Sequence, residues 1–426
     1  MELRRRRRSP LPGSSTEPSG SGLRKPSAVV LVGGASGALV ALALSPVLSR
    51  VYDPAEFGAF SAAVAVSSSL VGFSTLRLEV LALGVRDKDE SNRLVWLGFL
   101  VLLGITLFVF GATGLVYSIA NMPVWSLLIA PMVFFASLQL IGGAIYVRRQ
   151  EYKRLSTANF LQQAGTPVFQ VSLGAVGMGV YGLLAGFALA RAAWLPSMIE
   201  MLRSSRPRMI DGPSHWSQVR KGLVPGFSGL INSIGGQLII LIPIALYGNA
   251  VGGLIGMAVR IIISPLSLVS QSVASAANGQ VGLAFRSGHT NSAIRIIHRG
   301  MRDQAMIATV PLIAVGVGAP WIVTRLLGEQ WRETGFAISA LALGALFQFA
   351  VAPFAQILNI AGQSRALISW DTSRLLIYSI ALVLPYFLGL NWIASIWSYS
   401  IAQVILYVGL AWLITRRIRA QAGPLN

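Results

Sequence analysis

Four arginines lie within long apolar stretches of the chain, namely Arg77, Arg191, Arg260 and Arg374. An ionised side chain in a hydrocarbon core costs roughly 2.5–3.5 kcal/mol, so such a group normally faces a cavity or a partner. A guanidinium keeps its proton and binds phosphate oxygens through two parallel hydrogen bonds. These arginines therefore favour an anionic, phosphate-bearing cargo, whereas a cavity that holds a cation would need acidic residues.

Two acids accompany these arginines. Asp371 lies one helical turn from Arg374, where the two can form an ion pair, and Glu79 lies close to Arg77. Such pairs could simply join helices, and Arg77 could extend to the lipid headgroups. Asp371 and Glu79 are also the buried acids that could carry a coupling H⁺ or bind Na⁺, and the sequence leaves the ion open.

Arg260 has no acid near it in the sequence. Its predicted position is ~12 Å inside the outer end of its helix, close to the membrane midplane. Arg374 is predicted to be similarly deep from the cytoplasmic end, and Arg77 and Arg191 to lie nearer the cytoplasmic side. Arg260 is therefore the first candidate for contact with the cargo.

The elements that must position these residues are apolar stretches of about twenty residues, each long enough to span a bilayer core of ~30 Å. Hydrophobic residues make up 54 % of the chain and charged residues 12 %, which is typical of an integral membrane protein. With no Cys in the chain, disulfides and thiolate metal sites are excluded. The predicted spans are 27–49, 57–82, 94–118, 123–147, 157–177, 179–199, 223–247, 250–275, 303–325, 336–361, 366–389 and 391–415.

Basic residues are concentrated in alternate gaps between these spans and at both termini. The other gaps hold only Arg50, Arg325 and Arg332. Basic residues in short loops stay in the cytoplasm, so both termini are predicted to be cytoplasmic in a bacterial inner membrane. The net charge of +19 is scattered over these loops, which favours anionic lipid headgroups as partners and argues against nucleic acid.

The chain is predicted to be an all-α polytopic membrane protein with about 12 transmembrane helices in two six-helix bundles. A polar stretch at 203–222 is predicted to be a cytoplasmic linker between bundles at 27–202 and 223–415. Residues 1–26 are predicted to be a disordered basic tail, and 416–426 a cytoplasmic tail. The segment 58–64 matches 253–259 at the outer end of the second helix of each half. This match indicates a parallel pseudo-repeat, with a cleft between the halves near mid-membrane, although short Gly/Ala segments can also match by chance.

Six segments carry a family resemblance, and in chain order they are 44–58, 74–79, 86–90, 251–260, 264–269 and 328–335. They resemble the oligosaccharide flippases of the polysaccharide biosynthesis family, in the multidrug/oligosaccharidyl-lipid/polysaccharide exporter superfamily. One departure lies at Arg77-Leu78-Glu79, where the family usually shows Arg-Tyr-Glu, so one aromatic contact is missing.

The resemblance implies two six-helix bundles in a V and the transfer of polyprenyl-diphosphate-linked oligosaccharide from the cytoplasmic to the outer leaflet by alternating access. It also implies that Asn232, Gln237 and Asn359 fall in spans lining the cleft, where amides suit sugar hydroxyls. Each amide could equally join helices. A monomer is expected, polysaccharide assembly enzymes are candidate partners, and no cofactor is expected besides a coupling ion.

Two other functions stay open. A drug or ion antiporter of the same superfamily would share the fold. A membrane glycan polymerase is less favoured, because the longest predicted external loop, Leu326–Thr334, is too short to carry an active site. The three histidines fall in predicted cytoplasmic loops and the chain has no Walker loop, so the protein is predicted not to be an enzyme.

Overall fold

A computed structural model describes residues 24–85, 87–120, 122–203, 215–286 and 290–421. All regular elements in these ranges are helices. They are α1 (Arg24–Ala43), α2 (Ser45–Val51), α3 (Pro54–Ser74), α4 (Leu78–Gly84), α5 (Lys88–Ala120), η1 (Val124–Leu128), α6 (Ile129–Arg148), α7 (Tyr152–Ala175), α8 (Gly179–Arg191), η2 (Ala192–Trp194), α9 (Leu195–Arg203), α10 (His215–Tyr247), α11 (Asn249–Arg286), α12 (Thr290–Leu327), η3 (Glu329–Trp331), α13 (Arg332–Val351), η4 (Ala352–Phe354), α14 (Ile357–Ile360), α15 (Ser364–Phe387) and α16 (Trp392–Gln421).

Within the described ranges, 10 helical stretches are long and apolar enough to cross a membrane, and the pair α1–α2, bent by 41°, makes 11. The remaining predicted span corresponds to α7, which has 24 residues but is more polar than the others. Its Gln162 and Gln170 are buried, so α7 turns polar side chains inward instead of toward lipid. The protein is therefore a multi-pass membrane protein, and each predicted span corresponds to a helical segment.

Several helices extend beyond the predicted spans at the ends that are predicted to be cytoplasmic. α10 begins at His215 and α12 at Thr290, whereas the spans were predicted to begin at 223 and 303. These ends are more polar than the apolar stretches that follow them, so hydropathy alone does not include them. The predicted tail over 1–23 and the part of the predicted linker over 204–214 lie outside the described residues.

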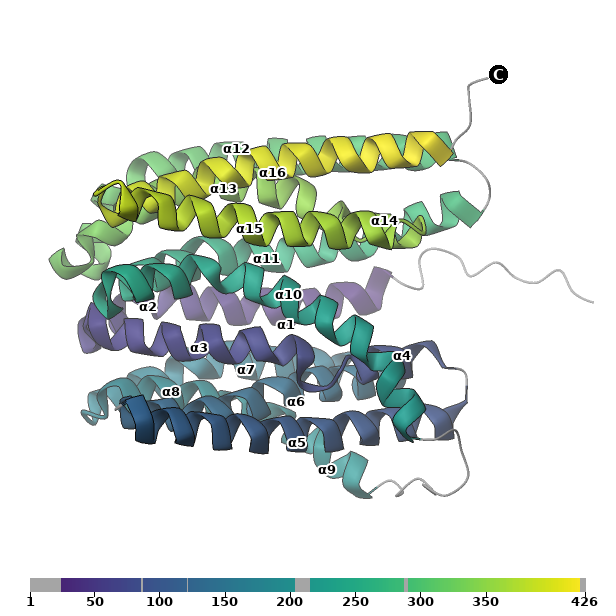
Figure 1. The fold of residues 1–426 in the computed structure, drawn as a ribbon, viewed down its shortest axis with the longest axis horizontal. Coiled ribbons are helices and arrows are strands. Elements are labelled where there is room, and N and C mark those ends of the chain that lie inside the picture. Colours follow the sequence, from purple (N-terminus) through teal and green to yellow (C-terminus); the bar gives the residue numbers. More distant parts are fainter. Residues whose placement is uncertain (1–23, 86, 121, 204–214, 287–289, 422–426) are drawn as a thin grey trace, which may run out of the picture.

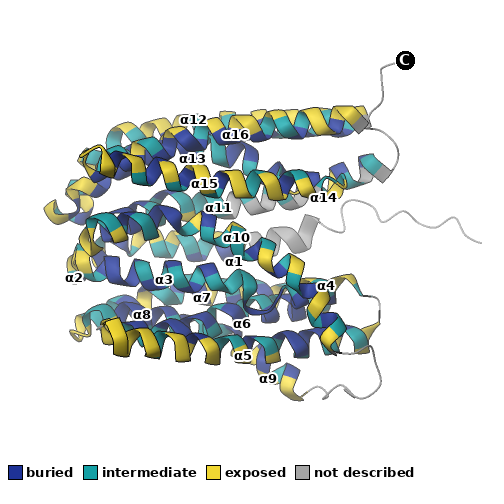
Figure 2. Ribbon diagram, in the orientation of Figure 1, coloured by how far each residue is buried: buried dark blue, intermediate teal, exposed yellow. Residues whose placement is uncertain are grey.

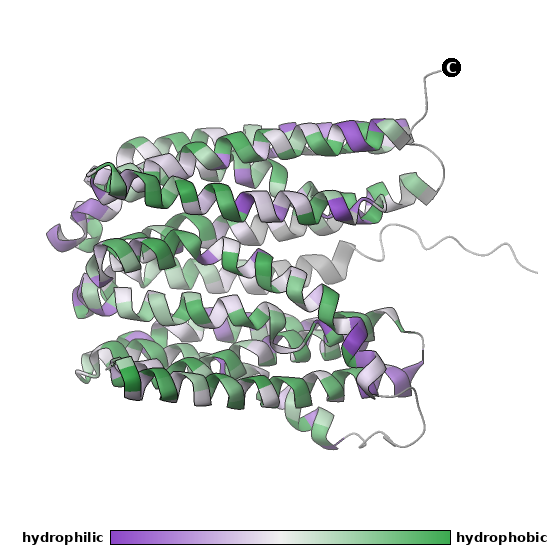
Figure 3. Cartoon of the chain, viewed as in Figure 1, coloured by the Kyte–Doolittle hydropathy of each residue, from purple (hydrophilic) through white to green (hydrophobic). Residues whose placement is uncertain are grey.

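The elements form two halves that lie side by side, α1–α9 and α10–α16, with most helices running along the long axis (Figure 1). The spans differ in how much of their apolar stretch is buried inside the protein. The buried share is 22 % in the span of α12 and 61 % in the span that contains α13. Exposed faces concentrate on peripheral helices such as α5 and α12 (Figure 2). Hydropathy shows that these faces are largely apolar, with polar residues more common near the helix ends, as contact with lipid requires (Figure 3).

The two copies of the sequence repeat meet where α3 packs against α11. A Cβ on Gly58 would overlap the carbonyl oxygen of Asn249, and a Cβ on Gly253 would overlap that of Pro54. Only glycine allows the backbones of the two helices to approach this closely. The halves are thus in direct backbone contact at the ends of α3 and α11 that are predicted to face outward.

A second set of contacts joins the two halves at the same end. The backbone carbonyl of Ser49 in α2 accepts hydrogen bonds from Gln330 Nε2 at 2.7 Å and Trp331 Nε1 at 2.9 Å. The ring of Trp331 also packs edge-on against Phe57, with centroids 5.7 Å apart. We call the contacts of Ser49, Gly58, Gly253, Gln330 and Trp331 the outer seam.

The residues Asp53 to Glu56, within the segment 44–58, form the start of α3. The carboxylate of Asp53 accepts a hydrogen bond from the backbone N–H of Glu56 at 2.8 Å, and the Glu56 carboxylate accepts one from the Asp53 N–H at 3.2 Å. Pro54 occupies the first turn, where its missing N–H costs nothing. This capping box begins α3 at a defined residue and so sets Gly58 against α11.

Candidate functional site

A cavity of about 340 Å³ lies between the halves. Residues of α1, α3, α7 and α8 line it from the first half, and residues of α10 and α11 from the second. Its charged lining residues are Arg191 and Arg260, and no Asp or Glu is among the described residues that line it. We call it the central cavity.

Arg260 and Arg191 reach the central cavity from opposite halves. Arg260 lies eleven residues, or ~16 Å, along α11 from its first residue, Asn249, and Arg191 lies twelve residues, or ~18 Å, along α8 from its first residue, Gly179. Each therefore lies near the middle of its predicted span. α8 ends at Arg191 and α9 continues the same span beyond it.

The two guanidinium groups are positioned by neutral partners. Arg260 Nη1 donates to Gln170 Oε1 at 3.3 Å, and Gln170 is itself anchored by a bond from its Nε2 to the Leu183 carbonyl at 3.1 Å. Arg191 Nη1 donates to the Phe187 carbonyl at 2.9 Å, and its guanidinium carbon lies 3.3 Å from the centre of the Phe187 ring.

Neither guanidinium forms an ion pair with any residue that the structure describes. Arg191 Nε also has no hydrogen-bond partner there. Two unpaired charges at this depth cost about 5–7 kcal/mol together on insertion scales. An anion bound beside either guanidinium in the central cavity would offset part of this cost.

Polar groups suited to hydroxyls surround the arginines. Gln237 lines the central cavity as predicted, and so do Gln162, Gln163 and Thr166 of α7. The aromatic rings of Phe57, Phe60 and Phe187 supply an apolar wall. Sequence reasoning did not single out Thr166 or the phenylalanines, because neither an isolated hydroxyl nor an aromatic residue is unusual in an apolar helix.

Arg374 and Asn232 are brought together away from the central cavity. Arg374 Nη2 donates to Asn232 Oδ1 at 2.7 Å and lies 3.2 Å from Asp371 Oδ1. The side chains of Arg374 and Asp371 are only 10 % and 12 % exposed. The predicted Asp371–Arg374 ion pair is thus present, and through Asn232 it joins α15 to α10 inside the second half.

Arg77 and Glu79 lie at a break between α3 and α4. Leu76 and Arg77 both have positive φ, 51° and 55°, a conformation that is strained for residues with a Cβ. The break packs on a glycine face of α10, where a Cβ on Gly229 would lie 2.8 Å from Arg77 Nε. Glu79 is 5 % exposed, and its Oε2 has no hydrogen-bond partner among the described residues. Neither Arg77 nor Glu79 lines the central cavity.

The last predicted cargo residue, Asn359, is exposed in the short helix α14. Its Nδ2 donates to Gln356 Oε1 at 2.9 Å, so it makes a local contact. Of the nine predicted residues, the central cavity therefore gathers Arg191, Gln237 and Arg260.

This sequence and this arrangement of helices are similar to those of known proteins. A family described as polysaccharide biosynthesis protein matches residues 47–335. The succinoglycan biosynthesis transport protein ExoT of Rhizobium meliloti (strain 1021) is 23 % identical over 391 residues, which cover 87 % of this chain and 76 % of that protein. The lipid II flippase MurJ in an inward closed conformation has a TM-score of 0.69 at 13 % identity, covering 93 % of this chain and 90 % of MurJ. An inward-facing MATE family transporter of the MOP superfamily has a TM-score of 0.67 at 16 % identity, and the match covers 96 % of this chain and 97 % of the transporter chain. These similarities confirm the predicted fold of two helical bundles.

Proposed function

The chain belongs to the polysaccharide biosynthesis protein family, with the fold of MOP-superfamily transporters, and on that premise we propose that it moves a polyprenyl-diphosphate-linked oligosaccharide across the membrane. Transport would run from the cytoplasmic to the outer leaflet of a bacterial inner membrane, with both termini in the cytoplasm. The product would enter surface polysaccharide synthesis. One chain already contributes both walls of the central cavity, so we propose that it acts as a monomer.

One observation carries this proposal. Arg191 and Arg260 come from opposite halves, face one cavity near mid-membrane and have no carboxylate partner among the described residues. A diphosphate brings the negative charge and the paired oxygens that two guanidiniums bind. Gln163 and Gln237 can hydrogen-bond to sugar hydroxyls beside it. The lack of lining acids disfavours a cationic drug as cargo.

Alternating access follows from the same arrangement. We propose that the outer seam closes the central cavity at one end, so that cargo enters from the cytoplasmic end and the seam then separates to release it. Binding of one diphosphate by arginines of both halves would couple loading to the relative movement of the halves. The basic cytoplasmic loops could receive the enzymes that assemble the glycan.

We propose that Glu79, in preference to Asp371, is the acid that couples transport to H⁺ or Na⁺. Asp371 is already paired with Arg374, so its charge is neutralised in this state. The Glu79 carboxylate is buried at the strained break that contacts α10 of the other half, and one of its oxygens has no described partner. Protonation of Glu79 would therefore act where the halves meet.

The test uses cells that lack the protein, with add-back of wild type, Arg260→Gln, Arg191→Gln or the double variant. Spheroplasts are treated with an impermeant glycan-cleaving enzyme, which reports how much lipid-linked glycan has reached the outer leaflet. Each arginine should contribute about 1.5–3 kcal/mol, so each single variant should slow flipping about 10- to 150-fold. Arg325→Gln is the matched control, because Arg325 stacks on Trp321 at the outer end of α12, away from the central cavity.

The outcomes separate the candidate functions. Protected glycan in the deletion strain, rescue by wild type and Arg325→Gln, and failure of the double variant would support the proposal. Rescue by the double variant at normal protein level would refute the cargo role of the arginines. Glycan that is accessible without the protein would exclude flipping, with unpolymerised glycan indicating a polymerase. Normal surface glycan would indicate a drug or ion antiporter.

A further inference from the structure

A second cavity, of about 440 Å³, opens at the cytoplasmic end of the first half. It is lined by α4, α5, α6 and α9, with Gln150 just beyond α6, and no residue of the second half contributes to it. Among its lining residues are Lys88, Arg148 and Arg149, which belong to the basic loops. We call it the flank cavity. The transport path does not use it, since the central cavity lies between the halves.

The lining of the flank cavity changes from polar to apolar with depth. Lys88 and Asn92 stand in the first turns of α5, and Trp96 follows one turn deeper in the membrane. α6 runs in the opposite direction and shows the same order, with Ala144 deeper and Arg148 at the cytoplasmic end. A ligand that fits this gradient is charged at one end and apolar at the other.

The apolar end of the flank cavity leads onto a lipid-facing surface. Leu100, Leu103 and Leu107 follow Trp96 along α5 and are all exposed large hydrophobic residues. Trp96 itself is half-buried at the level where aromatic rings favour the membrane interface. An acyl chain leaving the cavity would therefore continue along α5.

The polar end carries two basic side chains, Lys88 and Arg148, that form no ion pair with the residues the structure describes. The Arg148 guanidinium donates to the backbone carbonyls of Ala82 and Val85, both at 2.9 Å, and of Asp87 at 3.0 Å. These bonds hold Arg148 in place and cap the end of α4, yet they cancel none of its charge. Among the described residues, Lys88 forms no ion pair.

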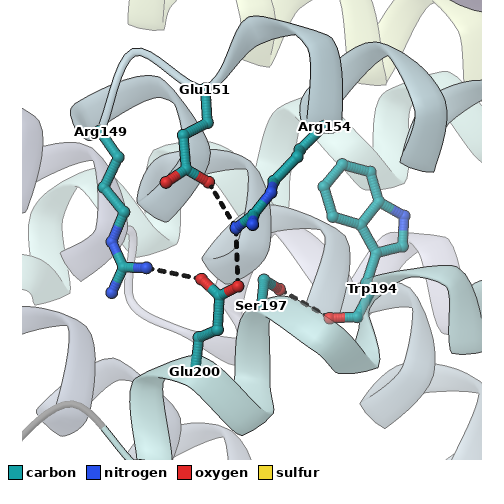
Figure 4. A network of polar contacts seen from close by, with 6 residues as sticks. All are labelled: Arg149, Glu151, Arg154, Trp194, Ser197 and Glu200. Carbon is teal, nitrogen blue, oxygen red and sulfur yellow. Dashed lines mark hydrogen bonds and ion pairs between the residues drawn. The ribbon is translucent and has the colours of Figure 1, made fainter.

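Arg149 belongs to a balanced network beside the flank cavity (Figure 4). It pairs with Glu200 at 2.6 Å, and Arg154 pairs with Glu200 at 2.7 Å and with Glu151 at 3.0 Å. The two carboxylates raise the pKa of the exposed Arg154 guanidinium above its ordinary value. Two arginines thus balance two glutamates, and the net charge of the cavity comes from Lys88 and Arg148.

We propose that the flank cavity binds the headgroup of an anionic phospholipid from the cytoplasmic leaflet, with its phosphate beside Lys88 and Arg148 and an acyl chain along α5. Basic cavities between membrane helices on the cytoplasmic side are suited to such headgroups. The bound lipid would bridge α4, α5 and α6, whose ends already meet through the bonds of Arg148 and through the Ser91 hydroxyl, which donates to the Ala82 carbonyl at 2.8 Å. It would stabilise the first half without occupying the transport path.

The test measures thermal unfolding of the purified full-length protein after delipidation and addition of phosphatidylglycerol or phosphatidylcholine. Native mass spectrometry counts the lipids that stay bound. Lys88→Gln removes the positive charge of a lining residue that forms no ion pair among the described residues. Asn92→Trp fills the flank cavity with a large side chain and leaves the charges of its lining residues unchanged. Lys153→Gln is the matched control, because Lys153 is an exposed lysine at the start of α7 that does not line the cavity.

Phosphatidylglycerol should raise the unfolding temperature of the wild type and of Lys153→Gln more than phosphatidylcholine does. Lys88→Gln should bind phosphatidylglycerol about fivefold more weakly, since one basic contact at the membrane surface contributes about this factor. Asn92→Trp should lose the bound lipid, and if it does not fold, Lys88→Gln carries the test.

Three results would overturn the proposal. Equal stabilisation by both lipids, or equal losses in Lys88→Gln and Lys153→Gln, would show that no specific site exists. Full stabilisation by glycerol 3-phosphate alone would identify a site for free phosphate. Displacement of phosphatidylglycerol by a polyprenyl diphosphate at much lower concentration would make the flank cavity a loading site for cargo.

Discussion

Replacing Gly58 with alanine should open the outer seam. A Cβ at this position would overlap the Asn249 carbonyl oxygen and lie 3.0 Å from the backbone N of Gly253. Both neighbours are backbone atoms of α11, which cannot rotate away as a side chain would. The helices must therefore separate in the closed state, whereas a state with a parted seam would accept the methyl group without strain.

The size of the effect follows from the overpacking. Forcing a methyl group into a well-packed contact costs about 1–3 kcal/mol. If only the closed state bears this cost, the equilibrium shifts toward the open state about 5- to 150-fold. Gly104→Ala is the matched control, because a Cβ on Gly104 in α5 would have no other atom within 4 Å. It should leave the equilibrium unchanged.

The assay uses the natural absence of cysteine from the chain. Ser49→Cys provides a single thiol at a residue that is 0 % exposed within the seam. A membrane-impermeant maleimide added from outside should label it at least fivefold faster in Gly58→Ala, and at the parent rate in Gly104→Ala. Unchanged labelling of Gly58→Ala at normal protein level would refute the reasoning, because the seam would then not be the part that opens.

Other changes probe the remaining contacts. Arg374→Leu should destabilise the protein by about 3–5 kcal/mol, because it leaves the largely buried Asp371 unpaired. Adding Asp371→Leu should restore most of the unfolding temperature. An unfolding temperature that stays low in the double variant would contradict this account. Trp331→Phe removes the hydrogen bond to the Ser49 carbonyl, worth about 1 kcal/mol, and should raise labelling of Ser49→Cys about fivefold. Asp53→Ala should cost about 0.5–2 kcal/mol through loss of the helix cap, while Asp53→Asn, which keeps an acceptor, should unfold near the wild-type temperature.

The local sequence was sufficient to predict the membrane-spanning helices and the contacts between side chains of one helix. A stretch of about twenty apolar residues has to become a helix, since lipid cannot satisfy its backbone polar groups. The Asp371–Arg374 pair was predictable for a similar reason, because three residues of separation place two side chains on one helical face. Hydropathy did not predict the starts of α10 and α12, where each helix extends beyond its apolar stretch into polar sequence.

Contacts between distant segments could be only partly anticipated. The repeat around Gly58 and Gly253 indicated two related halves, but the sequence did not show that its two copies touch. Likewise, the segments around Ser49 and Trp331 were recognised separately, and only the structure joins them in the outer seam. Each of these contacts depends on how the two bundles dock, which no local pattern encodes.

The sequence by itself determined that the chain is a multi-pass membrane protein, where its helical segments lie, and which charges fall within apolar stretches. Only the tertiary structure decided that Arg191 shares the central cavity with Arg260 while Arg374 and Arg77 are engaged elsewhere. The physical reason is that helices in a membrane are apolar toward lipid as well as toward one another. Hydrophobic periodicity therefore does not reveal which face turns inward, and close packing between helices sets the rotation of each one.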